Sequence, residues 1–212
     1  MNDKIRILLA EDHESVRQGL CALFSGAAEF EVVADVKDGA AAVSRARDTS
    51  PDVVVMDLSM PTPGLVAMRE IMNARPETAV VVLTRHRDSA YVRAAFDAGA
   101  QGYVLKQSPF SELTKAVSVA ARGERYLDQR LTGDPALAHT VLESGTSPLS
   151  HRETEVLRRA ASGHANKDIA AELRISVKTV EAHKANAMRK LRITDRSGLV
   201  RYAVMQGWLQ DE

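Results

Sequence analysis

The strongest constraint on the fold is an alternation, within the first 125 residues, between short apolar runs and segments with helical spacing. Five runs rich in Val, Ile and Leu are predicted strands: Ile5–Leu9, Glu31–Val36, Val53–Met56, Val80–Leu83 and Gly102–Leu105. The predicted helices are Val16–Phe24, Ala40–Arg47, Val66–Asn73, Tyr91–Ala98 and Ser111–Arg122. Uninterrupted apolar strands are buried on both faces, and strands that alternate with helices form parallel sheets. The sequence therefore predicts an α/β fold with a doubly wound, five-stranded parallel sheet.

Length and composition limit the classes of protein that this chain could be. Its 212 residues are enough for one large or two modest domains, each with a core. No apolar stretch approaches the ~18 residues that span a bilayer, and Met1–Lys4 lacks the apolar core of a secretory signal. We therefore expect a cytoplasmic protein that does not enter a membrane. Cys21 is the single cysteine, which excludes an intramolecular disulfide and a zinc site built from cysteines.

The net charge of zero conceals a difference between the two ends of the chain. Residues 1–147 contain 16 Lys and Arg against 20 Asp and Glu, whereas residues 148–212 contain 12 against 8. A small basic segment that follows an acidic one suggests two domains, the second of which meets an anionic polymer.

Polar residues follow four of the predicted strands. They are the pair Glu11-Asp12, then Asp57, Thr84 and Lys106. Because parallel strands present their carboxyl ends at one edge of the sheet, where ligands bind, we expect these side chains to meet. Clustered carboxylates repel one another unless a cation lies among them, and hard oxygen ligands favour Mg²⁺ over zinc. A hydroxyl and an ammonium beside the metal suit phosphoryl chemistry. Taken singly, each residue could instead cap a turn or a helix.

Residues 1–125 resemble a CheY-like receiver domain, the phospho-accepting module of two-component response regulators. The resemblance rests on Glu11-Asp12, on "MDLSMP" around Asp57, on "VVLTRH" around Thr84 and on "GAQGYVLKQ" around Lys106. It implies that Asp57 accepts a phosphoryl group from a histidine kinase. It also implies that Mg²⁺ is bound by Glu11, Asp12, Asp57 and the backbone carbonyl of Ser59, and that Thr84 and Tyr103 move on activation.

The loop after "MDLSMP" departs from the pattern of this family. Receivers of this group usually place a glycine four residues after the proline, but here Gly64 follows Pro61 by three, with a second proline between them. We expect a shorter, stiffer loop beside Asp57.

Residues 126–147 are rich in Gly, Ser, Thr and Pro and are predicted to be a linker, with one short helix at Pro135–Glu143. Residues 148–212 have helical patterns throughout. Ser150 and Glu153 form a capping box that opens a helix to Ala161. The other predicted helices are Lys167–Leu173, capped by Asn166; a longer helix from Ser176 to Leu191; and Leu199–Gln206.

Two of these helices, joined by a short turn, have the spacing of a helix-turn-helix. Val180, Ala187, Met188 and Leu191 are expected to face the core of this unit. A small helical bundle with merely solvated charges is the alternative. Residues 148–209 resemble the DNA-binding domain of the LuxR/FixJ group, and "KTVEAHKANAMRKL" is the most specific stretch. The resemblance implies phosphate contacts from Asn166, Lys167, Lys178, Thr179, Lys184 and Lys190, base contacts from Glu181, Ala182 and Ala185, and a structural or phosphate-facing His183.

Together these features predict a phosphorylation-controlled transcription regulator of the NarL/FixJ type, with domains at residues 1–125 and 148–212. It would not be a turnover enzyme, and phosphorylation would favour a homodimer whose recognition helices enter successive major grooves of double-stranded DNA. Two alternatives stay open. One is a regulator controlled by protein contact, with a vestigial acid site; the other is a Mg²⁺-dependent phosphohydrolase. Phosphohydrolases that use an aspartate nucleophile usually have a second Asp two residues on, where Ser59 stands here.

Overall fold

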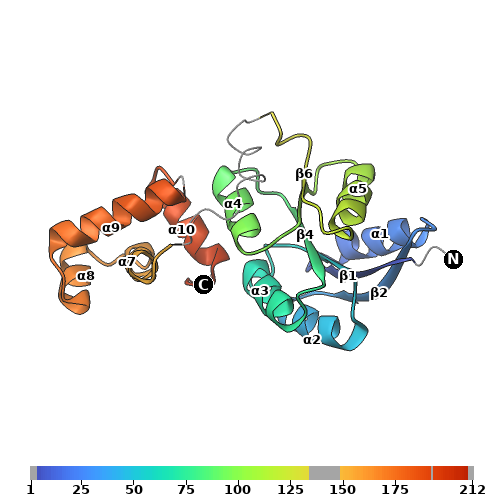
Figure 1. Ribbon diagram of the computed structural model, residues 1–212, viewed down its shortest axis with the longest axis horizontal. Helices are drawn as coiled ribbons and strands as arrows, with labels where there is room; N and C mark the ends of the chain where they lie inside the picture. Colours follow the sequence, from blue (N-terminus) through green and yellow to red (C-terminus); the bar gives the residue numbers. More distant parts are fainter. Residues whose placement is uncertain (1–3, 134–148, 192, 210–212) are drawn as a thin grey trace. The chain divides into compact units, whose positions relative to one another are not determined.

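A parallel sheet with the strand order β2-β1-β3-β4-β5-β6 forms the centre of the N-terminal unit (Figure 1). The computed structural model describes residues 4–133, 149–191 and 193–209. The chain divides into two units, residues 1–144 and 145–212, and each is described by itself. The strands are β1 (Ile5–Ala10), β2 (Phe30–Val36), β3 (Val53–Met56), β4 (Ala79–Thr84), β5 (Gly102–Leu105) and β6 (Tyr126–Leu127).

Helices cover both faces of this sheet, with α1 and α5 on one side and α2 and α3 on the other (Figure 1). The helices of this unit are α1 (Glu14–Ser25), α2 (Gly39–Thr49), α3 (Gly64–Ala74), α4 (Ser89–Asp97) and α5 (Phe110–Ala120). Every residue of β3 and β4 is buried. The doubly wound architecture is therefore confirmed, because only a sheet covered on both faces buries whole strands in this way.

The sheet has one strand more than the sequence predicts. Tyr126 and Leu127 form β6, which pairs in parallel with β5 through Gly102 and Tyr103. The sequence pattern assigns these two residues to the linker, because a strand of two residues is too short to show a period. The prediction of five strands is corrected to six. The predicted helix Pro135–Glu143 lies outside the described residues.

The C-terminal unit consists of helices in the part that the structure describes. They are α7 (His151–Ala161), α8 (Asn166–Leu173), α9 (Val177–Lys190) and α10 (Arg196–Met205). The capping box is confirmed, since the Ser150 hydroxyl accepts from the Glu153 amide and the Glu153 carboxylate accepts from the Ser150 amide. Among the described residues, no helix combines the length and the apolar character needed to cross a bilayer.

Two predicted helix starts in this unit are wrong. Asn166 is the first residue of α8 rather than its cap, and Ala165 occupies the capping position without a side-chain bond. Helix α10 begins at Arg196, three residues before the predicted Leu199, because the Asp195 carboxylate accepts from the amide of Gly198 at 2.7 Å. A glycine in the first turn weakens the helical signal of the sequence, but the aspartate cap compensates for it.

Candidate functional site

The carboxyl ends of β1, β3, β4 and β5 bring the predicted polar residues to one edge of the sheet. Glu11 follows β1, Asp57 follows β3 and Lys106 follows β5, while Thr84 is the last residue of β4. Glu11 and Asp57 are buried, with only 2% and 1% of their surface exposed. Two buried carboxylates at the same edge of the sheet require a compensating positive charge.

Lys106 supplies this positive charge. Its ammonium Nζ lies 2.7 Å from Glu11 Oε2, 2.9 Å from Glu11 Oε1 and 2.8 Å from Asp57 Oδ2. The backbone of the same residue is fixed as well, because the Lys106 amide donates to the Thr84 carbonyl at 2.8 Å. The side chain therefore bridges two acids that are separated by 46 positions in the sequence.

His13 joins the acidic cluster, although sequence analysis does not single it out. Its ring Nδ1 lies 2.7 Å from Asp12 Oδ1 and 3.1 Å from Glu11 Oε1. Glu11, Asp12, His13 and Asp57 each offer one ligand atom, and these atoms lie within 4.8 Å of one another. Three carboxylates so close together match the oxygen ligands that Mg²⁺ prefers. The acidic cluster could therefore hold a metal ion.

Ser59 is placed beside Asp57 by the loop between β3 and α3. Its amide donates to Asp57 Oδ1 at 3.1 Å, so Asp57 is oriented by a backbone donor on one oxygen and by Lys106 on the other. The loop closes tightly, since the Gly64 amide donates to the Leu58 carbonyl. A Cβ atom at Gly64 would lie 2.2 Å from the Asp57 carbonyl oxygen, which only glycine avoids. This closure is how the short loop fits against Asp57.

The two predicted switch residues share a partner, the backbone of His86. The Thr84 hydroxyl accepts from the His86 amide at 3.3 Å, and the Tyr103 hydroxyl donates to the His86 carbonyl at 2.9 Å. Both side chains are fully buried, and burial raises the pKa of Tyr103 well above its ordinary value. The His86 ring stacks on Tyr91, with 3.9 Å between ring centroids, and its Nε2 lies 3.2 Å from the Ser59 hydroxyl. His86 thus connects the two predicted switch residues, Thr84 and Tyr103, to the loop after Asp57. No sequence pattern indicates this role of His86.

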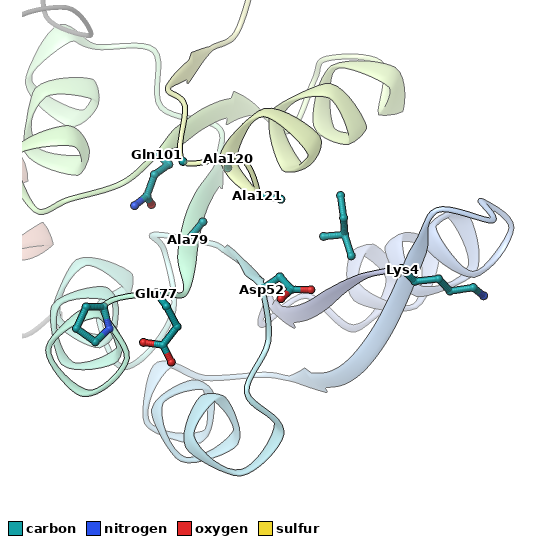
Figure 2. Close-up of a pocket in the computed structure, with 10 residues that line it drawn as sticks. Lys4, Asp52, Glu77, Ala79, Gln101, Ala120 and Ala121 are labelled. Atoms are coloured by element: carbon teal, nitrogen blue, oxygen red, sulfur yellow. The ribbon is translucent and has the colours of Figure 1, made fainter. Parts of the chain in front are cut away.

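One pocket of the N-terminal unit lies far from this site. It has a volume of about 360 Å³ and lies at the opposite edge of the sheet, where the strands begin (Figure 2). Its polar lining includes Lys4, Asp52, Glu77 and Gln101. Asp52 and Gln101 already accept hydrogen bonds from the backbone amides of Arg6 and Val80. The pocket therefore contributes nothing to the acidic cluster.

A second candidate site is the exposed face of α9. Arg174 has a left-handed backbone, with φ of 52°, and ends α8, while the Ser176 hydroxyl caps α9 by accepting from the Thr179 amide at 3.0 Å. Of the predicted core residues, Val180, Ala187 and Leu191 are buried and Met188 is partly buried. The remaining residues predicted for this face lie toward solvent: Lys178, Glu181, Ala182 and Ala185 are exposed, and His183 and Lys184 are half-buried. The helix-turn-helix geometry follows the prediction.

The other predicted phosphate contacts differ in their surroundings. Lys167 is exposed and Asn166 is half-buried at the start of α8. Thr179 is half-buried, with its hydroxyl 2.7 Å from that of Ser176. Lys190 has a protein partner, because its ammonium lies 2.7 Å from Glu153 Oε2 and holds the pKa of that buried carboxyl below its ordinary value. A phosphate contact from Lys190 stays a prediction, and its structural role is to stabilise the capping box of α7.

Comparison with known proteins identifies the families of both units. The family described as "Response regulator receiver domain" matches residues 7–118, and the family "Bacterial regulatory proteins, luxR family" matches residues 147–203. The chain is 38% identical over 219 residues to the "Oxygen regulatory protein NreC" of Staphylococcus epidermidis, covering 97% of this chain and 100% of that protein.

Solved structures agree over nearly the whole chain. RcsB from Salmonella enterica serovar Typhimurium, bound to a promoter in the presence of phosphomimetic BeF3-, is 27% identical with a TM-score of 0.73, covering 96% of this chain and 100% of that one. A structure of two RcsB dimers bound to two parallel DNAs is 26% identical with a TM-score of 0.69, covering 96% and 99%. The chain therefore belongs to the NarL/FixJ response regulators, and it is a phosphorylation-controlled transcription regulator that joins a receiver domain to a LuxR-type DNA-binding domain.

Proposed function

We propose that Asp57 is the phosphoryl acceptor and that a histidine kinase supplies the phosphoryl group. The observation that carries this proposal is the pair of bonds from one ammonium, that of Lys106, to the buried carboxylates of Asp57 and Glu11. A carboxylate oxygen of Asp57 attacks phosphorus while the bond from phosphorus to the kinase imidazole breaks, and the electron pair of that bond stays on the imidazole. The reaction moves the phosphoryl group once and leaves this chain modified, so it is not turnover catalysis.

Side chains already in place can compensate the negative charge of the incoming phosphoryl group. The Lys106 ammonium is the nearest donor to Asp57 and can transfer one of its bonds to a phosphoryl oxygen. Glu11, Asp12, Asp57 and the Ser59 carbonyl would hold Mg²⁺, which would neutralise the negative charge that develops on the phosphoryl oxygens. His13 lies against the same carboxylates and would help to orient them. In this arrangement the metal ion and the Lys106 ammonium would both contact the carboxylates of Asp57 and Glu11.

The switch follows from the bonds to His86. A phosphoryl oxygen on Asp57 attracts the Thr84 hydroxyl as a donor, which takes that hydroxyl away from the His86 amide. Tyr103 holds the carbonyl of the same residue, so loosening His86 changes what the Tyr103 hydroxyl can bind. One added charge thereby alters the surface formed by β4, α4 and β5, as a two-state switch requires.

The output would be a homodimer on double-stranded DNA in the cytoplasm. Two copies related by a two-fold axis place two recognition helices in successive major grooves, and RcsB binds DNA as dimers. In this arrangement Lys167, Lys178, Thr179 and Lys184 contact phosphates, whereas Glu181, Ala182 and Ala185 face base edges.

Mass measurement tests the acceptor directly. Incubation of the full chain with Mg²⁺ and acetyl phosphate should add one phosphoryl group to the wild type and none to Asp57→Asn. The same phosphorylated sample should show a larger mass by light scattering and bind a DNA site obtained by selection more tightly, and Asp57→Asn should show neither change. Labelling of Asp57→Asn would move the acceptor elsewhere. Labelling of the wild type without a change in mass or affinity would mean that protein contact controls the DNA step.

A further inference from the structure

The segment after α5 is bound to the loop that carries Lys106. Strand β6 pairs with β5, and Asp128 directly after it is fully buried. The Asp128 amide continues the strand pairing by donating to the Tyr103 carbonyl at 2.9 Å. A fully buried carboxylate that bonds to no ammonium or guanidinium in the described part of the chain is costly unless several donors satisfy it.

Three donors do satisfy Asp128; one belongs to the last residue of β5 and one to the β5–α5 loop. Its Oδ2 accepts from the Leu105 amide at 3.0 Å and from the Ser108 hydroxyl, while its Oδ1 accepts from the Arg130 amide at 2.9 Å. Leu105 precedes Lys106 by one residue, and Ser108 follows it by two. The carboxylate therefore holds the chain on both sides of the lysine, through the backbone amide of Leu105 and the side-chain hydroxyl of Ser108.

Two further bonds complete this hold on the loop. The Arg130 guanidinium donates to the Gln107 carbonyl at 2.7 Å, and on the other side the Lys106 amide donates to the Thr84 carbonyl. Lys106 is consequently clamped between β4 and the segment from β6 to Arg130. Its side chain has four rotatable bonds, so a fixed backbone restricts the positions that its ammonium can reach.

We infer that Asp128 is a positioning residue for Lys106: by fixing the β5–α5 loop, it sets the reach of the Lys106 ammonium toward Asp57 and thereby the rate at which Asp57 is phosphorylated. The inference rests on the proposed function of Asp57. Asp128 touches neither the acceptor nor the phosphoryl group, so its effect passes through Lys106 alone. The same segment continues the chain toward the DNA-binding unit. A shift of the loop that carries Lys106 would therefore also displace the C-terminal end of the receiver.

Glu112 provides a matched control. It is also buried, and its Oε2 accepts from the Tyr126 hydroxyl at 2.6 Å and from the Gln129 amide at 3.3 Å. It therefore fixes the same segment, but among the described residues the bonds of its carboxylate are to Lys115, Tyr126 and Gln129, and none reaches the stretch from Leu105 to Ser108. Glu112→Gln and Asp128→Asn each remove one buried negative charge while conserving shape, so they should affect stability alike and differ in their effect on Lys106.

The test is a double-mutant cycle on the full chain, with the rate of phosphorylation by acetyl phosphate and Mg²⁺ as the readout. Asp128→Asn should lower the rate about tenfold, since misplacement of a charged group by a fraction of an ångström weakens its contribution to this extent. In the Lys106→Ala background the same substitution should have no further effect. Glu112→Gln should leave the rate within about twofold of the wild type in both backgrounds.

A second readout is independent of phosphorylation. Hydrogen exchange of the Leu105 amide should be faster in Asp128→Asn and unchanged in Glu112→Gln, because only the first weakens the group that accepts from that amide: an asparagine keeps one uncharged oxygen where the carboxylate has two for its three donors. If Asp128→Asn fails to fold, Ser108→Ala removes one donor and should give a smaller decrease in the same cycle. An equal decrease with and without Lys106, or an unchanged rate, would overturn the inference. A wild type that is never labelled would instead refute the proposed function.

Discussion

Gly64→Ala tests whether the short loop beside Asp57 has room to move. The added Cβ would lie 2.2 Å from the Asp57 carbonyl oxygen and 2.9 Å from the Leu58 Cα, whereas real Cβ contacts are essentially never below 3.0 Å. Neither obstacle is a flexible side chain. The Asp57 amide is bound to the Ala10 carbonyl at 2.9 Å, so the loop cannot retreat without loosening its link to β1.

The expected cost has two opposing parts. Overpacking of this kind costs about 1–3 kcal/mol, whereas the loss of glycine freedom in the unfolded chain returns about 0.4–1 kcal/mol. We expect a net loss of roughly 1–2 kcal/mol in the free energy of unfolding of the receiver. Because the displaced backbone carries Asp57 itself, phosphorylation by acetyl phosphate should slow by about tenfold or more.

Urea unfolding followed by far-ultraviolet circular dichroism measures the first effect, and intact mass against time measures the second. Gly19→Ala is the matched control, because Gly19 lies in α1 and, among the described residues, nothing lies within 4 Å of its added Cβ. This control should gain about 0.5–1 kcal/mol from helix propensity and be phosphorylated at the rate of the wild type. A Gly64→Ala variant as stable and as rapidly labelled as the control would refute the steric argument.

Four further predictions concern the C-terminal unit. Ser176→Ala removes the cap of α9 and should cost about 1 kcal/mol in thermal unfolding followed by tryptophan fluorescence, with Ser176→Asn close to the wild type. Lys190→Met should cost about 1–2 kcal/mol at neutral pH. Lys190 lowers the pKa of Glu153, so the ion pair contributes its full stability above the ordinary pKa of a carboxyl group. This contribution disappears as the pH falls through the lower pKa that Glu153 has in the folded protein. A cost of Lys190→Met that stays constant into acid would contradict the ion pair. In DNA binding, Lys184→Ala should weaken all sequences alike and lower the slope of log affinity against log salt by about one. Glu181→Ala should instead relax one base pair per half-site by ~1–3 kcal/mol, and selection of an unchanged site would remove it from the base-reading residues.

The sequence by itself determined where the central strands lie along the chain and which residues stand at their carboxyl ends. Short apolar runs report burial on both faces directly, which is why the bounds of β3 and β5 match the prediction. The sequence also determined the capping box of Ser150 and Glu153 and the cap of α9, because each depends on residues only three positions apart.

The sequence predicted that the residues at the strand ends would meet, but only the tertiary structure decided which atoms bond to one another across long separations. The bond between Lys106 and Glu11 joins residues 95 positions apart, and that between Lys190 and Glu153 joins residues 37 apart, so no local period encodes them. Strand β6 is likewise invisible in the sequence, because two residues acquire strand geometry only by pairing with β5. Asp128 therefore lies in a stretch whose composition is that of a linker, yet its side chain is as buried as that of a core residue. The physical reason is that a local pattern records only which face of a segment is buried. The partner of a buried charge depends on how the whole sheet packs.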